Sequence, residues 1–155
     1  MSLTHNTFEI RKTYSASPSA IFGAFAFQDR KSRWYAASPS HEPLSYSFDF
    51  RPGGEERLTA RMLPGTPIAG QELCWISTYA EIVENERIVF FQTLDVDQAR
   101  VSAAVVTVEI APKEGETEVV LTHQAVYMEG ADGPAMRRMG WEYLLDAMAS
   151  SAGTV

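Results

Sequence analysis

The chain has 155 residues, of which 45% are hydrophobic and 21% are charged. This length suffices for one domain with its own core, and this composition is too apolar for a disordered chain. The formal net charge is −7 and the basic residues are scattered rather than clustered, which argues against a nucleic-acid partner. We therefore expect residues 1–155 to form a single domain that folds alone.

Targeting and cysteine patterns point to the cytoplasm. The first residues, MSLTHNTFEIRK, lack the apolar core of a signal peptide, and no run of about 18 apolar residues could cross a membrane. Cys74 is the single cysteine, which rules out an internal disulfide bond and a cysteine-based zinc site. We expect a cytoplasmic protein without a membrane span.

The first predicted elements are a strand and two short helices. Residues 8–14 alternate between apolar and polar side chains, as in a strand with one covered face. Ser17 followed by Pro18 is typical of a helix N-terminus, and the apolar spacing that follows predicts a helix over residues 18–27. Asp29 is expected to cap a second short helix before the prolines that follow it.

Residues 44–127 have the pattern of antiparallel strands with short connections. Tyr46, Phe48 and Phe50 share one strand face, so one side of the sheet is expected to be covered. Gly53 and Gly54 then predict a hairpin turn, because glycine adopts positive φ without steric cost. The six predicted strands cover residues 44–51, 55–63, 70–83, 86–94, 101–111 and 117–127.

The last segment, ADGPAMRRMGWEYLLDAMASS, predicts a long helix that covers the sheet. Asp132 is the expected N-cap, and Trp141, Leu144, Leu145 and Met148 form an apolar stripe at helical spacing. The element order is therefore strand, two helices, six strands and one helix. This order predicts an α+β fold in which a curved antiparallel sheet of about seven strands surrounds the C-terminal helix.

Seven stretches between about residues 8 and 148 resemble one known superfamily. They are YSASPSAIFGAF, RKSRWY, FDFRPGGEER, YAEIVENERIVF, VTVEI, TEVVLTHQ and GWEYLLDAM. In this order they resemble the START-like superfamily, whose fold is the helix-grip or birch-pollen-allergen fold. Within it they are similar to the family named for the activator of the heat-shock protein 90 ATPase. One such fold can carry many unrelated functions.

The resemblance implies an apolar cavity between the curved sheet and the C-terminal helix. We expect it to bind a small hydrophobic or aromatic ligand, with no cofactor. The candidate ligand-binding residues are Trp34, Phe48, Phe50, Trp75, Tyr79, His123, Trp141 and Leu145. No metal site is expected, because His5, His41 and His123 lie on separate segments without ligand spacing.

An enzymatic alternative is a polyketide cyclase or aromatase, as in other branches of the superfamily. Glu81 and His123 are the candidate acid and base if both face the cavity, where burial would raise the pKa of the carboxyl group. The phase of the strand over residues 70–83 leaves this open, since Trp75 and Ile76 compete for the same face. A lone histidine on an apolar face is more commonly part of the core, so binding without catalysis is the expected function.

A third expectation is a protein-interaction role like that of the family's namesake, a co-chaperone of the heat-shock ATPase. The chain contains one domain, whereas the namesake implies a clamp of two domains. A homodimer formed through an exposed sheet edge is also left open.

Overall fold

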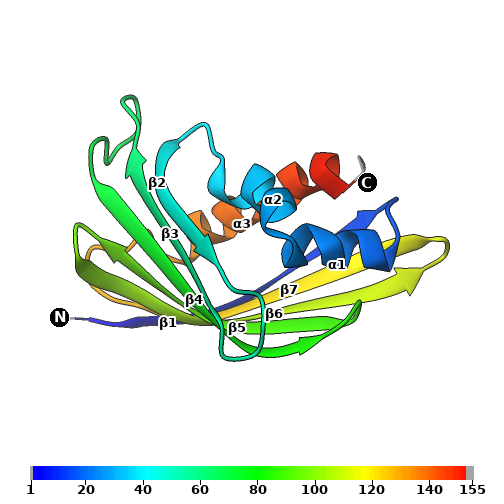
Figure 1. Ribbon diagram of the computed structural model, residues 1–155. Helices are drawn as coiled ribbons and strands as arrows, with labels where there is room; N and C mark the ends of the chain where they lie inside the picture. The colour runs from blue at the N-terminus through cyan, green and yellow to red at the C-terminus, as the bar shows by residue number, and fades with distance from the viewer. Residues whose placement is uncertain (1, 153–155) are drawn as a thin grey trace.

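The computed structural model describes residues 2–152, which fold into one curved sheet and a layer of helices (Figure 1). The strands are β1 (Thr4–Tyr14), β2 (His41–Phe48), β3 (Glu55–Met62), β4 (Glu72–Val83), β5 (Arg87–Val96), β6 (Ala99–Lys113) and β7 (Glu116–Tyr127). The helices are α1 (Pro18–Ala26), α2 (Gln28–Lys31), the π-helix η1 (Ser32–Ala36) and α3 (Pro134–Ala152). None of the helices within residues 2–152 is long and apolar enough to cross a membrane.

All seven strands belong to one antiparallel sheet with the order β1-β7-β6-β5-β4-β3-β2. The chain therefore returns to the sheet edge where it began, and β7 pairs with β1. Figure 1 shows the strands curving around the helices, which all lie on the same side of the sheet. The predicted α+β helix-grip fold is confirmed.

The N-terminal helices follow the sequence signals in part. The Ser17 hydroxyl accepts a hydrogen bond from the Ala20 amide at 3.2 Å, and Pro18 occupies the first turn, as expected for a capped helix. Asp29 is not a cap, which corrects the prediction. The N-cap of α2 is Phe27, whose side chain makes no capping bond, and Asp29 lies inside the first turn, where its charge suits the helix dipole.

The N-cap predicted for the long helix is also wrong. Helix α3 begins at Pro134, and the Asp132 carboxylate instead accepts two hydrogen bonds from the Arg137 guanidinium, at 2.7 and 2.8 Å. This bidentate pair uses both carboxylate oxygens. The predicted apolar stripe is confirmed, because Trp141, Leu145 and Met148 are buried and Leu144 is partly buried against the same core.

A β-bulge decides which face of β4 points inward. Trp75 packs against the core and Tyr79 is buried within it, and the pairing with β5 then shifts between Tyr79 and Glu81. Ala80 is the extra residue, so the alternation restarts and Ile82 rather than Glu81 packs against the core. One inserted residue therefore turns Glu81 to the outer surface.

The glycine pair between β2 and β3 forms the predicted turn, with a separate requirement at each position. Gly53 has a φ of +82°, which side-chain-bearing residues rarely adopt. A Cβ atom on Gly54 would lie 2.1 Å from the Asp49 carbonyl oxygen. The first glycine is needed for its backbone conformation and the second for the close approach of two chain segments.

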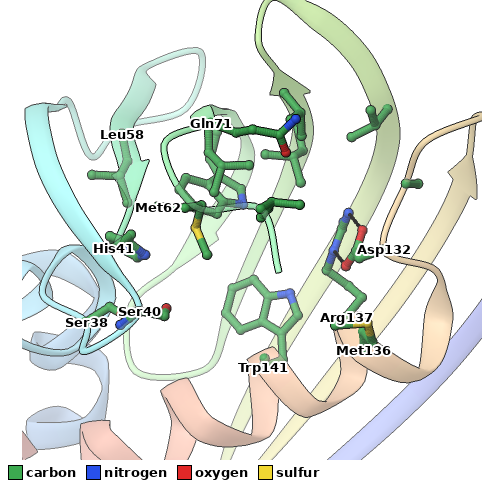
Figure 2. Close-up of a pocket in the computed structure, with 18 of the residues that line it drawn as sticks. Ser38, Ser40, His41, Leu58, Met62, Gln71, Asp132, Met136, Arg137 and Trp141 are labelled. Atoms are coloured by element: carbon green, nitrogen blue, oxygen red, sulfur yellow. Dashed lines mark hydrogen bonds and ion pairs between the residues drawn. The ribbon is translucent and has the colours of Figure 1, made fainter. Parts of the chain in front are cut away.

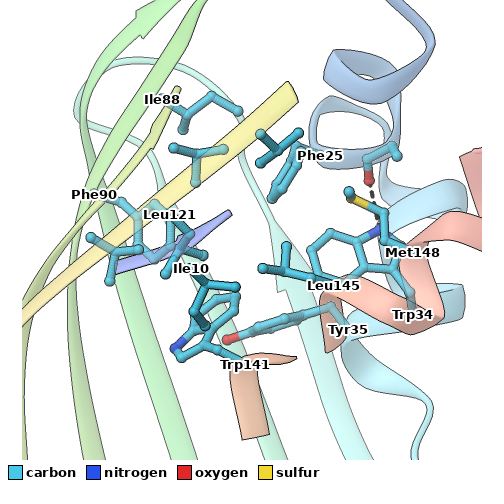
Figure 3. Close-up of a cluster of buried hydrophobic side chains, with 14 of the residues drawn as sticks. Ile10, Phe25, Trp34, Tyr35, Ile88, Phe90, Leu121, Trp141, Leu145 and Met148 are labelled. Carbon is cyan, nitrogen blue, oxygen red and sulfur yellow. Dashed lines mark hydrogen bonds between the residues drawn. The ribbon is translucent and has the colours of Figure 1, made fainter. Parts of the chain in front are cut away.

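The main core lies between the sheet and the C-terminal half of α3 (Figure 3). Leu145 and Met148 from α3 meet Ile10 of β1 and Leu121 of β7, all fully or almost fully buried. The Trp34 indole also belongs to this core and donates to the Ala24 carbonyl oxygen at 2.9 Å. The C-terminal half of α3 is therefore packed tightly against the sheet.

Candidate ligand-binding site

A cavity of about 460 Å³ lies between the N-terminal half of α3 and strands β2 to β6 (Figure 2). This volume is within the range of small-molecule sites. Its apolar lining includes Leu58, Met62, Leu73, Trp75, Leu94, Val96, Val101, Trp141 and Leu144. Its polar lining includes Ser38, Ser40, His41, Gln71, Gln92, Asp132 and Arg137. The composition is that of a binding site for an apolar molecule oriented by a few polar groups.

The cavity exists because the two halves of α3 carry different side chains. Leu145 and Met148 fill the space at the C-terminal half. At the N-terminal half, Arg137 turns toward Asp132, and Gly140 has no side chain. A Cβ atom on Gly140 would meet nothing within 4 Å, so packing does not require glycine there, although glycine costs a helix interior about 1 kcal/mol relative to alanine. We infer that Gly140 keeps this end open.

The entrance is marked by large apolar side chains that line the cavity and yet remain exposed. Met136 and Tyr143 on α3 are 60% and 49% exposed, and Ile68 in the β3–β4 loop is 39% exposed. Exposed apolar side chains grouped in this way are typical of binding surfaces. The cavity therefore opens between α3 and the β3–β4 loop.

His41, at the start of β2, forms one polar wall. Its Nε2 lies 3.0 Å from the Ala36 carbonyl oxygen, which can only accept, so Nε2 carries the proton and Nδ1 is left as an acceptor. The ring lies against Trp75, with 5.6 Å between the ring centroids. Burial lowers the pKa of His41, and the bond to Ala36 opposes this only in part. The imidazole is therefore neutral at pH 7.

The π-helix η1 places Tyr35 at the inner end of the cavity. Short π-helices are frequently found at functional sites, and here the same turn provides the Ala36 carbonyl that holds His41. The Tyr35 hydroxyl accepts from Gln92 Nε2 at 2.9 Å, and Gln92 also donates to Ser77 at 3.1 Å. Burial, followed by the nearby charge of Glu56, holds the pKa of Tyr35 well above its usual value, so its hydroxyl stays protonated.

The opposite wall contains a paired charge. Arg137 donates to both oxygens of Asp132 and also to the Ser102 hydroxyl at 3.0 Å. Its guanidinium carbon lies 5.2 Å from the centroid of the Tyr127 ring, which is a cation–π contact. The positive charge is therefore neutralised within the protein. Among residues 2–152, no three histidine, cysteine or acidic side chains are grouped closely enough to hold a metal ion.

Behind Tyr35 lies a buried charge network that sequence reasoning missed. Lys31 Nζ donates to Glu56 Oε1 at 2.6 Å and lies 4.5 Å from the centre of the Tyr35 ring. Tyr79 donates to the same oxygen at 2.8 Å, and Tyr46 donates to the other. Burial and the Glu56 charge raise the pKa of Tyr46 and Tyr79 far above the usual value, which keeps both hydroxyls as donors.

The structure brings together only some of the sequence-predicted ligand-binding residues. Trp75 and Trp141 line the cavity. Trp34, Tyr79 and Leu145 are buried in the core instead, and the other three candidates also lie outside the cavity lining. Those three are Phe48 and Phe50, which pack against the core, and His123, which is fully buried on β7.

Glu81 and His123, the candidate acid and base, are not brought together. Glu81 is exposed and accepts from Arg87 Nε at 2.6 Å, and this bond and the Arg87 charge lower the pKa of its carboxyl group. His123 stacks on Phe8 with 4.7 Å between ring centroids. Neither ring nitrogen of His123 has a hydrogen-bond partner within residues 2–152. Burial, with a smaller contribution from the Arg137 charge, lowers its pKa to about 4.

Strand parity could have identified some of the missed residues. Gln92 shares the inward face of β5 with Phe90 and Leu94, and Glu56 shares that of β3 with Leu58. A polar residue that alternates with buried apolar ones is a signal for a buried hydrogen-bonded group. Arg137 gave no such signal, because its pairing with Asp132 depends on the loop that precedes α3.

A curved sheet that grips one long helix, with an apolar cavity at one end of that helix, defines a START-like, helix-grip protein. The sequence matches the family described as "Activator of Hsp90 ATPase homolog 1-like protein" over residues 15–153. The chain belongs to this family, as the sequence motifs indicated. No curated protein matches the sequence.

Similar solved structures come from several bacteria. An uncharacterised protein of Rhizobium leguminosarum is 29% identical, with a TM-score of 0.89 over 99% of this chain and 98% of its own. Protein Mll3558 of Rhizobium loti is 34% identical, with a TM-score of 0.83 over 97% and 99%. An AHSA1-like protein of Aeromonas hydrophila is 21% identical, with a TM-score of 0.65 over 95% and 93%, and supports the fold alone.

Proposed function

We propose that the protein binds a small hydrophobic or aromatic molecule in the cavity beside α3 and does not transform it. The observation that carries this proposal is the cavity of about 460 Å³, with its largely apolar lining and its exposed apolar entrance. Burial of a ligand's apolar surface would contribute about 25 cal/mol per Å² before the costs of association. The fold of the family, which commonly holds hydrophobic ligands, supports the same function.

The two alternatives have less support. A cyclase that uses Glu81 or His123 would need these side chains in the cavity, and neither lines it. The co-chaperone role draws on family membership, to which no described surface of this chain adds a specific feature. Ligand binding is therefore the function that the geometry favours.

The test begins with native mass spectrometry of the purified protein to detect a retained molecule. A titration with pyrene, a fluorescent aromatic hydrocarbon, then measures binding and the accompanying rise in melting temperature, which must increase with ligand concentration. No retained molecule, together with no fluorescence change and no thermal shift, would contradict the proposal.

The variant Gly140→Leu tests whether the cavity is the site. Gly140 lines the cavity and a Cβ atom there would meet nothing within 4 Å, and leucine is a better helix former than glycine, so binding should be lost while stability is kept. Met139→Leu is the matched control, because Met139 is 68% exposed on the adjacent position of the same helix. This control should bind pyrene like the unmodified protein. Equal binding by both variants would place the ligand elsewhere.

A further inference from the structure

Within residues 2–152, His41 Nδ1 and Trp141 Nε1 are hydrogen-bonding groups of the cavity wall without a partner, and the charged side chains that line the cavity are paired. Resting on the function proposed above, we propose that the ligand is an uncharged aromatic or polycyclic molecule that carries a hydroxyl donor for His41 Nδ1 and an oxygen acceptor for Trp141 Nε1. The cavity would thus select hydroxylated or oxygenated ring systems over plain hydrocarbons and over carboxylates.

Trp141 supplies the donor. The residue is only 4% exposed, and its indole nitrogen has no hydrogen-bond partner among residues 2–152. In contrast, the other buried indole, that of Trp34, donates to a carbonyl oxygen. Trp141 Nε1 is not one of the fully buried atoms that lack a partner, so it is accessible from the cavity that Trp141 lines, and a tryptophan N–H on an apolar wall usually finds a partner. Figure 2 shows the Trp141 indole standing in the space between His41 and the Arg137–Asp132 pair, where a ligand oxygen would complete its bonding.

His41 supplies the acceptor. Because Nε2 donates to the Ala36 carbonyl, the lone pair of the neutral ring is on Nδ1. No bond to Nδ1 is formed within the described part of the chain. A neutral imidazole held by its other nitrogen has a fixed orientation, so it favours a ligand hydroxyl at one position rather than an apolar atom. The carbonyl from η1 therefore determines which group the cavity recognises.

The absence of an unpaired charge excludes anionic ligands from good binding. Arg137 is the cation that lines the cavity, and both oxygens of Asp132 already pair with it. Lys31 is sealed against Glu56 behind Tyr35. A carboxylate entering the cavity would lose its hydration without gaining a counter-charge, which is unfavourable. The acceptor for Trp141 is therefore a neutral oxygen, as in a hydroxyl, ether or ketone.

Four pyrene derivatives of similar size separate these contributions in fluorescence titrations at pH 7. Pyrene has neither group, 1-methoxypyrene has an acceptor, 1-hydroxypyrene has a donor and an acceptor, and 1-pyrenecarboxylate is an anion. We expect 1-hydroxypyrene to bind most tightly and the carboxylate most weakly. Each neutral hydrogen bond should add about 3- to 10-fold in affinity.

Two variants assign the bonds. Trp141→Phe keeps an aromatic ring and removes the donor, so it should weaken both 1-methoxypyrene and 1-hydroxypyrene by about 3- to 10-fold and leave pyrene unchanged. His41→Phe should weaken 1-hydroxypyrene alone. Should His41→Phe fail to fold, the Trp141→Phe variant and the ligand series on the unmodified protein still decide the question.

The outcomes distinguish this inference from the proposed function. Tightest binding by 1-pyrenecarboxylate, or equal binding of pyrene and 1-hydroxypyrene, would overturn the inference while pyrene binding itself upholds the cavity as a ligand site. Failure of all four compounds to bind would overturn both proposals. The expected order, with the selective losses in the two variants, would establish the hydroxylated or oxygenated class.

Discussion

The ammonium group of Lys31 and the carboxylate of Glu56 lie 2.6 Å apart inside the protein, with side-chain exposures of 3% and 1%. One comes from the short helix α2 and the other from β3, so the pair ties the helical layer to the sheet. Two tyrosine hydroxyls and the aromatic rings around the ammonium complete the bonding of both charges. Such a pair is tolerated in the interior because neither charge is left without a partner.

Breaking this pair should be costly. In Lys31→Met the Glu56 carboxylate loses its counter-charge in a buried position, so we expect a loss of about 3–5 kcal/mol in the free energy of unfolding. Urea denaturation followed by circular dichroism measures it. The control is Arg51→Met, which removes the exposed pair with Asp49 and should cost less than about 1 kcal/mol. Similar small losses in both variants would show that the buried pair does not contribute as described.

His123 should make the protein sensitive to acid. Its folded pKa of about 4 lies below the ordinary value of 6.5, so the unfolded state binds more protons between these two values. As far as His123 is concerned, the free energy of unfolding is therefore highest above pH 6.5. It declines as the pH falls toward 4, by about 3 kcal/mol in total. His123→Leu removes this contribution, and its stability should fall less than that of the unmodified protein between pH 7.5 and pH 4.

Urea denaturation at several pH values measures the difference. His123→Leu should also be more stable at neutral pH, because the two unpartnered ring nitrogens are replaced by apolar atoms. His5→Gln, at an exposed position of β1, keeps His123 and serves as the control. An unchanged pH dependence in His123→Leu would assign the acid sensitivity to other groups.

The two glycines between β2 and β3 should differ in their response to alanine. Gly53→Ala places a side chain at a φ of +82° with open space around it, which should cost about 1–2 kcal/mol. Gly54→Ala would bring Cβ to 2.1 Å from a backbone oxygen and must displace the turn, so a larger loss is expected. Thermal unfolding of the two variants tests this order. If positive φ alone determined the cost, Gly53→Ala would be the more destabilising change.

The sequence predicted the periodic parts of the fold well. Alternation located the strands, and the Ser17-Pro18 signal located α1. The prediction failed where a specific side-chain pair or an inserted residue changes a local preference. Asp132 has the chemistry of an N-cap, and it pairs with Arg137 because the loop before α3 places the two together. The bulge at Ala80 left no mark in composition, so the inward phase of β4 could not be assigned.

The candidate site was harder to predict than the fold. Trp75 and Trp141 were identified because large aromatic side chains on the inner face are natural lining residues. Gly140 lines the cavity and contributes only the space that a side chain would fill. His41 gains its role from the Ala36 carbonyl of a π-helix, an element that propensity does not predict. The site depends on an absent side chain and on which nitrogen of His41 carries the proton. The spacing of residues in the sequence predicts neither.

The burial of Lys31 between the helical layer and the sheet affects its chemical reactivity. The chain contains three lysines, and the side chains of Lys12 and Lys113 are 29% and 54% exposed, against 3% for Lys31. An amine-reactive reagent can therefore modify the other two lysines in the native state, whereas Lys31 reacts only when the helical layer separates from the sheet. The rate of labelling at this one amine reports how frequently that separation occurs. A ligand that stabilises the closed form slows it.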